Sequence, residues 1–289
     1  MKKLFKLRVS DSLPVPVGEV DSGVVAMAYS DKTGDLLSAN FTDRTVRFCF
    51  RGNEVLFRVP KPGKPNGLCV SGNGLSAIVR DDLGRISWQV GIVSSVVRPL
   101  VGRKGVDAFC HRYRQADVRV DKMNGICQIP GAVLITADDS HCLFAVCDDS
   151  AVRVVGGNGS KGFSVAASLQ TSMLDSPGSV CSVPSGLLCL CDSGNGVIRV
   201  VNPSGMRHVS IFGNPAQKSK SDGGAASARL VCPSNISAVS GGAAFVDGGR
   251  SLRLLDLKSS SIKTMYESAG FLGPVACSPD TIYFVEDLR

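Results

Sequence analysis

Residues 174–212, LDSPGSVCSVPSGLLCLCDSGNGVIRVVNPSGMRHVSIF, contain the clearest pattern in the chain. Four apolar segments, at 178–183, 187–191, 197–201 and 208–212, are separated by clusters of Pro, Ser, Asn, Asp and Gly that are typical of turns. The pattern predicts four antiparallel strands within about 40 residues. Because one such sheet cannot bury both of its faces alone, we expect it to pack against similar sheets.

The same order of strands and turns recurs at a spacing of about 45 to 50 residues, which is typical of propeller blades. Six such units account for all 289 residues, so we expect a single all-β domain over 1–289, a six-bladed β-propeller with four-stranded antiparallel blades. The expected blades are 24–60, 66–101, 124–156, 177–212, 233–267, and 272–289 together with 3–20.

The last unit supplies only two strands, at 275–278 and 282–285, before the sequence ends. Residues 3–9 and 14–20 have strand character, and we expect them to complete this blade as its outer two strands. Such a two-plus-two closure would remove an open sheet edge.

Several segments resemble the NHL-repeat family of β-propellers. Residues 65–70 (PNGLCV) resemble its Pro-x-Gly-hydrophobic segment, and residues 192–199 (DSGNGVIR) resemble its turn and basic strand. Residues 156–163 and 221–230 resemble the connectors between NHL blades. The resemblance covers nearly the whole chain, is weakest before residue 60, and implies a propeller. Some family members, the animal translational regulators, bind RNA on the loop face.

Composition and cysteine usage exclude several classes of protein. No apolar run reaches the 18 residues or so that a membrane-spanning helix needs, and the basic N-terminus lacks the apolar core of a secretory signal. Eleven scattered cysteines do not form the disulfide pattern of a small secreted domain. We therefore expect buried thiols in a reducing intracellular compartment, most simply the cytoplasm, with the mitochondrion as an alternative. A zinc site at Cys189 and Cys191 would lack a second ligand pair.

One face of a propeller carries the connectors that enter each blade and the turns between its second and third strands. Acidic or amide residues recur there, and function is often located on such loops. The expected positions are Asn40, Asp43, Asp81, Asp82, Asp138, Asp139, Asp192, Asn195, Asp247, Glu286 and Asp287. A ring of carboxylates could hold a cation such as calcium. The ordinary interpretation is that these side chains form turns by bonding nearby backbone.

The connector 102–124 is the longest and most basic, and it interleaves aromatic residues with cations, as single-stranded nucleic acid requires. A pI of about 8.9 agrees with this reading. The candidate residues for binding a partner or RNA are Arg103, Lys104, Phe109, His111, Arg112, Tyr113, Arg114, Arg119 and Lys122, together with Lys61, Lys64, Lys218 and Lys220. Against RNA, the third strands also carry Arg47, Arg85, Arg199 and Arg253, which we interpret as ordinary solvated residues.

Catalytic motifs are missing from the sequence, which contains three histidines and no nucleophile elbow, zinc-protease motif or phosphate-binding lysine loop. His141 beside Asp138 and Asp139 is the best candidate for a metal-dependent lyase or hydrolase of the propeller type. We expect no enzyme activity and no cofactor. The main hypothesis is a scaffold that presents its loops to protein partners as a subunit of a larger assembly. RNA binding and metal-dependent catalysis are the alternatives.

Overall fold

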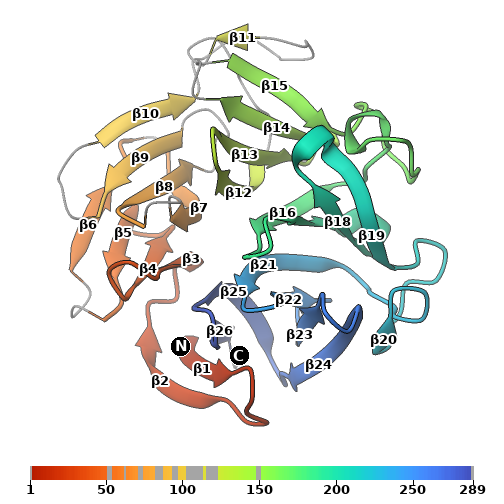
Figure 1. Ribbon diagram of the computed structural model, residues 1–289. Coiled ribbons are helices and arrows are strands. Elements are labelled where there is room, and N and C mark those ends of the chain that lie inside the picture. Colours follow the sequence, from red (N-terminus) through yellow and green to blue (C-terminus); the bar gives the residue numbers. More distant parts are fainter. Residues whose placement is uncertain are drawn as a thin grey trace.

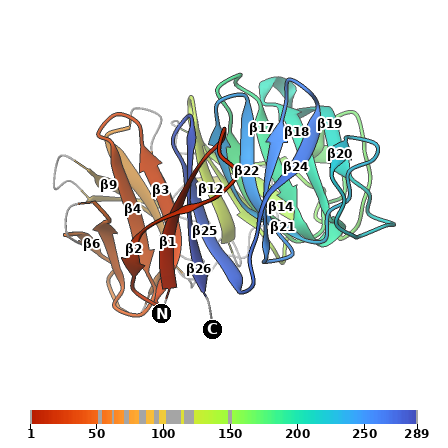
Figure 2. The same cartoon turned by 90° about the horizontal axis from the view of Figure 1, so that it is seen from below.

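The computed structural model describes residues 2–50, 54–61, 63–70, 74–81, 87–92, 97–101, 113–114, 123–147 and 151–287. Six antiparallel sheets surround a central channel (Figure 1). The predicted six-bladed β-propeller with four-stranded blades is therefore confirmed. Seen from the side, the blades form a disc (Figure 2).

The strands of each blade run from the channel outward in the order of the chain. Blade one contains β3 (Val24–Ser30), β4 (Asp35–Asn40), β5 (Thr45–Phe48) and β6 (Val55–Arg58). Blade two contains β7 (Pro65–Val70), β8 (Ser76–Asp81), β9 (Ser87–Gly91) and β10 (Val97–Val101). Blade three contains β12 (Met123–Ile129), β13 (Ala132–Ala137), β14 (Cys142–Cys147) and β15 (Ala151–Gly156).

The next two blades follow the same order. Blade four contains β16 (Pro177–Ser182), β17 (Leu188–Asp192), β18 (Val197–Asn202) and β19 (Arg207–Gly213). Blade five contains β21 (Pro233–Val239), β22 (Gly242–Asp247), β23 (Ser251–Asp256) and β24 (Ser261–Glu267). Two short strands, β11 (Tyr113–Arg114) and β20 (Gly223–Gly224), add a fifth strand to the outer edges of blades three and five. Short 3-10 turns are η2 (Leu169–Thr171), η3 (Ser193–Asn195) and η4 (Ser204–Met206).

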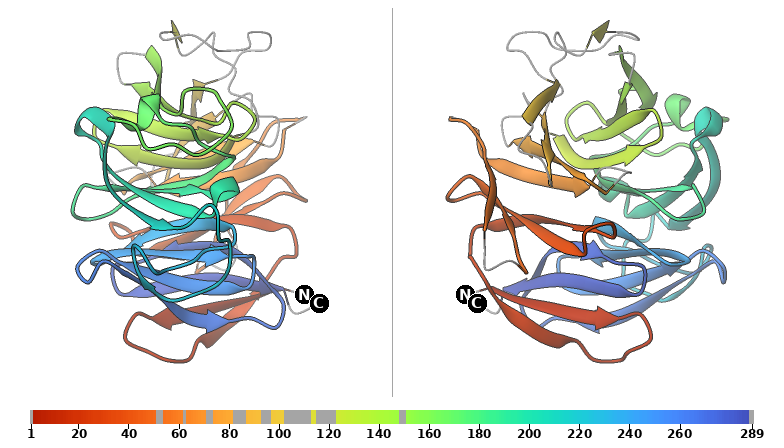
Figure 3. Two further views of the ribbon diagram at one scale, coloured as in Figure 1. Left: turned by 90° about the vertical axis from the view of Figure 1, so that its right-hand side faces the viewer. Right: turned by 60° about the vertical axis from the view of Figure 1, so that its left-hand side comes forward.

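Blade six combines both ends of the described chain. Its order from the channel outward is β25 (Phe271–Cys277), β26 (Thr281–Asp287), β1 (Lys2–Arg8) and β2 (Val15–Val20). β1 and β26 pair without a register shift, from Lys2 opposite Asp287 to Arg8 opposite Thr281. The two ends therefore lie side by side (Figure 3).

The core is distributed between the blades because each middle strand is covered on both sides. In β13 all six residues are buried, and successive side chains point to opposite faces of the sheet. Leu134 packs in the cluster shared with blade four, whereas Ile135 packs in the cluster shared with blade two. Buried apolar clusters of this kind occupy the space between every pair of neighbouring blades in the described part.

Cysteines contribute to these clusters as small apolar residues, and the ten that the structure describes are all free thiols. Cys189 and Cys191 lie on one face of β17, between blades four and five, and burial raises the pKa of Cys191. Burial likewise raises the pKa of Cys127 to about 12. Within the described part, every helix is too short to cross a membrane.

Candidate binding surface

One face of the disc is called the connector face here. It carries the connectors that enter each blade and the turns between the second and third strands. Its two best-described connectors are 157–176, which leads into blade four, and 214–232, which leads into blade five. Gly157 begins the first with φ of 80°, and a Cβ at this position would lie 2.1 Å from the carbonyl oxygen of His141. The connector can therefore start in this way only at a glycine.

A buried arginine attaches the first connector to blade four. Arg199 of β18 and Asp192 of β17 are both fully buried, and the Nε and Nη2 atoms of Arg199 lie 2.8 and 2.7 Å from Oδ2 of Asp192. The remaining guanidinium N–H groups donate to the carbonyl oxygens of Ser164 and Met173 in the connector. Asp192 also accepts the backbone N–H of Asp175. The ion pair thus links the blade to both limbs of its connector.

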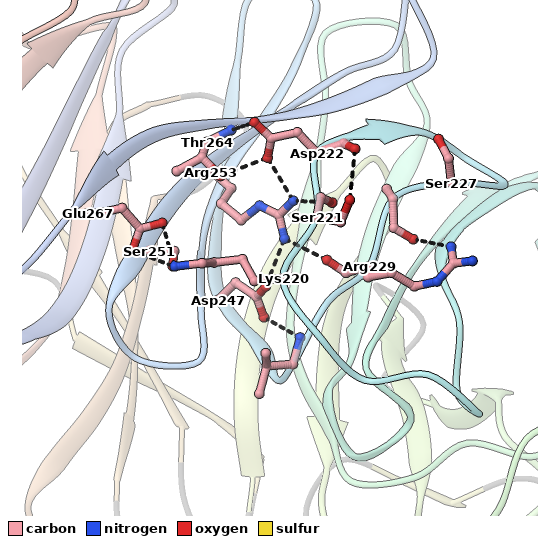
Figure 4. A network of polar contacts seen from close by, with 12 residues as sticks. Lys220, Ser221, Asp222, Ser227, Arg229, Asp247, Ser251, Arg253, Thr264 and Glu267 are labelled. Carbon is pink, nitrogen blue, oxygen red and sulfur yellow. Dashed lines mark hydrogen bonds and ion pairs between the residues drawn. The ribbon is translucent and has the colours of Figure 1, made fainter.

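Blade five repeats this arrangement (Figure 4). The buried Nη1 of Arg253 donates to Oδ2 of Asp247 at 2.9 Å and to the carbonyl oxygen of Arg229 at 2.8 Å. Its Nη2 donates to the carbonyl oxygen of Ser221 at 2.7 Å and to Oδ1 of Asp222 at 3.0 Å. Unlike Arg199, Arg253 therefore contacts two carboxylates, and Asp222 is 47% exposed.

Several charged groups that the sequence placed in solvent instead hold the fold together. The interpretation of the third-strand arginines as solvated is wrong for Arg199 and Arg253, because both strand faces are covered by neighbouring blades. In blade one, the half-buried Arg47 forms an ion pair with Asp43. Arg85 lies outside the described residues.

The acidic and amide positions whose bonds the structure describes form turns and buried bonds rather than an open ring at the channel. Asn40 accepts the backbone N–H groups of Thr42 and Asp43, as the turn interpretation expects. Asp247 accepts the N–H groups of Val231 and Cys232. Glu286 accepts the hydroxyl groups of Tyr266 and Ser268. None of the described acidic or amide residues expected in the ring lines the cavities of the channel.

The channel itself is apolar at its middle. One side chain from each inner strand lines both of its cavities: Met27, Leu68, Ile126, Val180, Ile236 and Val275. Each is at most 8% exposed, so these residues form a ring, called the apolar ring here, between the two cavities. The cavity on the connector face has a volume of about 80 Å³, and the one on the opposite face about 240 Å³.

Most of the predicted basic site falls on residues that the structure leaves undescribed. Arg103, Lys104, Phe109, His111, Arg112, Arg119 and Lys122 lie outside the described residues. Tyr113 and Arg114 form β11, which pairs with the outer strand β15, so this part of the connector lies at the rim of blade three and away from the channel (Figure 1).

The four remaining basic candidates are described, and three of them have intramolecular partners. Nζ of Lys64 lies 4.4 Å from the centre of the Phe41 ring. Lys218 donates to the carbonyl oxygen of Gly194, and Lys220 lies 2.8 Å from Glu267. Lys61 is exposed. Lys61 and Lys64 come from the connector between β6 and β7, and Lys218 and Lys220 come from 214–232. The structure does not gather these two pairs with β11 into one cluster.

The sequence did not single out an exposed apolar patch on the connector face. Phe271, at the start of β25, is 61% exposed, and Val231 is 42% exposed. Between them lies the turn at Gly248 and Gly249, because a Cβ at Gly248 would contact Val231 and one at Gly249 would contact Phe271. The Arg250 guanidinium lies 5.3 Å from the centre of the Phe271 ring. Val231, Gly248, Gly249, Arg250 and Phe271 are called the blade-five patch here.

The histidines at the predicted metal site and in blade four have structural partners. Nδ1 of His141 accepts the backbone N–H of Ser176 at 3.1 Å. Nε2 of His208 lies 3.0 Å from Oγ of Ser172. Among the residues that the structure describes, no three His, Cys, Asp or Glu side chains gather as metal ligands.

No protein-family model matches the chain, and no curated protein matches its sequence. Solved structures do match its fold. A streptogramin B lyase structure has 14% identity and a TM-score of 0.61, covering 98% of this chain and 80% of that chain. The putative TolB from Agrobacterium tumefaciens has 12% identity and a TM-score of 0.65, covering 100% and 98%. A chain of the nidogen/laminin complex has 13% identity and a TM-score of 0.63, covering 100% of both. At these identities the likeness establishes the β-propeller fold alone.

Proposed function

We propose that this protein is a non-enzymatic binding module that presents its connector face to a protein partner, as a subunit of a larger assembly. The observation that carries the proposal is the blade-five patch. Phe271 and Val231 expose apolar surface on either side of a glycine turn, and Arg250 lies beside the phenyl ring. Aromatic residues and arginine are the types that contribute most binding energy at protein interfaces.

The connectors around this patch are held before any partner arrives. The 214–232 connector is bonded to Arg253 through Ser221, Asp222 and Arg229. Asp247 fixes the backbone at Val231. Binding to a preorganised surface avoids much of the entropy cost of ordering loops.

Other observations favour a protein partner over RNA or a substrate. Three of the four described lysine candidates are engaged within the molecule, and the described histidines 141 and 208 have structural partners. The nidogen/laminin neighbour is a propeller found in a protein complex, which agrees with a binding role. The NHL resemblance of residues 65–70 and 192–199 is part of the proposal and is compatible with either ligand.

The test is quantitative affinity purification of the tagged protein from its native source. Phe271→Asp is the test variant, and Val209→Asp is the matched control, because Val209 is 55% exposed on the outer strand of blade four. Both variants place a charge at an exposed position and should fold. We expect the same partner proteins to be recovered with the wild type and with Val209→Asp. The recovered amount of these proteins should fall at least tenfold with Phe271→Asp, because the substitution removes a central contact.

Each other outcome counts against the proposal. Equal recovery with Phe271→Asp would exclude the patch as the contact surface. Loss of all recovered proteins after ribonuclease treatment would indicate an RNA-binding module instead.

A further inference from the structure

The face opposite the connector face, called the hairpin face here, opens into the larger channel cavity. This cavity of about 240 Å³ has the liquid volume of roughly eight water molecules. The apolar ring closes its inner end, and Gln128, Ser182 and Ser237 place polar groups on its wall. A small molecule with an apolar end could therefore enter from the hairpin face and rest on the apolar ring.

One side of this cavity differs from the rest. Among the described lining residues, Tyr29 is the only aromatic residue and Asp31 the only carboxylate, and both come from blade one. No described residue forms a hydrogen bond or ion pair with the Asp31 carboxylate or the Tyr29 hydroxyl. Partial burial raises the pKa of Asp31. The side chain is thus an acidic group without an internal counterion in the described part.

Tyr29 also belongs to an aromatic cluster at the boundary where blade six packs against blade one. Its ring stacks on that of Tyr283 from blade six, with centres 5.6 Å apart and an interplanar angle of 17°. Phe50, from the turn after β5, meets Tyr283 at 5.7 Å and 64°. Burial first, and then the carboxylates of Asp31, Asp280 and Asp35, raise the pKa of Tyr29. Tyr29 and Asp31 therefore line the cavity, whereas Tyr283 and Phe50 pack behind Tyr29 and do not line it.

We propose that this corner, formed by Tyr29 and Asp31 and backed by the ring of Tyr283, binds a small organic cation of the alkylammonium class. Aromatic faces attract quaternary ammonium groups, and a nearby carboxylate balances the charge. The apolar ring and the cavity volume set the size of the rest of the ligand. This site lies on the opposite face from the proposed protein-binding surface and does not depend on it.

Among the residues that the structure describes, no lysine or arginine forms an ion pair with Asp31. The net charge of +7 gives a cationic ligand no long-range attraction, so binding must come from the local groups. Lys32 follows Asp31 in the sequence, but its Cβ lies against Gly74 of blade two. Arg8 lies near Asp280, and its charge lowers the pKa of that carboxyl after the hydrogen bonds from Thr281 and Ser278.

The test compares choline with its neutral isostere 3,3-dimethylbutan-1-ol, titrated into the full chain and followed by NMR. We expect choline to bind at the Tyr29 corner at least about tenfold more tightly than the neutral alcohol. Asp31→Asn should weaken choline binding by roughly fivefold, and Tyr29→Leu should weaken it by roughly tenfold. Tyr29→Phe keeps the aromatic ring and should therefore bind choline like the wild type. Glu19→Gln is the control, because Glu19 is an exposed carboxylate on the outer strand β2.

Thermal unfolding of each variant establishes that it is folded. If Tyr29→Leu fails to fold, Asp31→Asn and the neutral isostere still decide the question, because Asp31 is exposed and its replacement removes no described contact. The proposal is overturned if choline and the neutral alcohol bind with equal affinity, or if Asp31→Asn and Glu19→Gln change choline affinity equally. It is also overturned if choline shows no saturable binding up to about 50 mM.

Discussion

Replacing Asp192 by Asn should destabilise this protein more than the equivalent change in the next blade. The substitution keeps the size of the side chain and removes its charge. Arg199 then stays fully buried with carbonyl partners at Ser164 and Met173 and no described carboxylate beside it. Removing one partner of a buried ion pair typically costs about 3 to 5 kcal/mol, because the other charge is left uncompensated. This is a large part of a total stability of roughly 5 to 15 kcal/mol.

The second blade supplies the comparison. Asp247→Asn leaves Arg253 with the carboxylate of Asp222, whose Oδ1 lies 3.0 Å from Nη2. A hydrogen bond to a charged group contributes about 1.5 to 3 kcal/mol, so Asp247→Asn should cost roughly 1.5 kcal/mol less than Asp192→Asn. Asp222→Asn, at a half-exposed position, should cost about 1 kcal/mol or less.

Urea unfolding of the three variants measures these differences. Limited trypsin digestion gives a second measurement that is specific to the connector, because Lys161 lies in 157–176 and its side chain is 68% exposed. Cleavage after Lys161 should become faster in Asp192→Asn and not in Asp247→Asn. The reasoning is refuted if Asp192→Asn loses less than about 1 kcal/mol, or if Asp247→Asn is the more damaging change.

Two further predictions concern single side chains. Among the ten described cysteines Cys232 alone is exposed, so iodoacetamide should modify it before the other nine in the native protein. Partial burial and the nearby Asp247 carboxylate raise its pKa and slow the reaction. Peptide mapping after brief labelling checks this, with Cys232→Ser as control, and earlier labelling of Cys189 or Cys191 would contradict it. Burial, and then the charge of Arg199, lower the pKa of His208 below 6.5. The folded state therefore favours neutral His208, and its contribution to stability is present above pH 6.5 and is lost as the pH falls through the lower folded pKa. An NMR titration that places the pKa of His208 at or above 6.5 would contradict this.

The turn chemistry of the sequence was sufficient to predict the number of blades, because Gly, Pro, Asn and Asp separate short apolar segments regularly. The role of the third-strand arginines was not predicted. In residues 197–201, VIRVV, an arginine among apolar residues resembles an outward-facing position of a half-buried strand. In a propeller, however, this strand is covered on both faces, so Arg199 has no solvent to reach. The signal that was available is the acidic residue at the end of the preceding strand, Asp192, which recurs as Asp247 before Arg253.

The aromatic corner of the hairpin face could not be predicted from local pattern. Tyr29 and Tyr283 are separated by most of the chain, and their contact depends on how blade six packs against blade one. The blade-five patch likewise requires the connector at Val231, the turn at Gly248 and Gly249, and Phe271 to be placed together in space.

The apolar ring separates the two proposed activities of the disc. Its six side chains lie between the two cavities and are nearly inaccessible, so a ligand in the larger cavity does not reach the connector face. The connectors are bonded to Arg199 and Arg253 on the connector face, at the opposite end of the blades from the larger cavity. Neither arginine lines that cavity. Coupling between two sites requires an element with two arrangements that both ligands bias, and the blades that the structure describes, packed on both faces, offer no such element. Phe271→Asp should therefore leave choline binding unchanged, and Asp31→Asn should leave partner recovery unchanged.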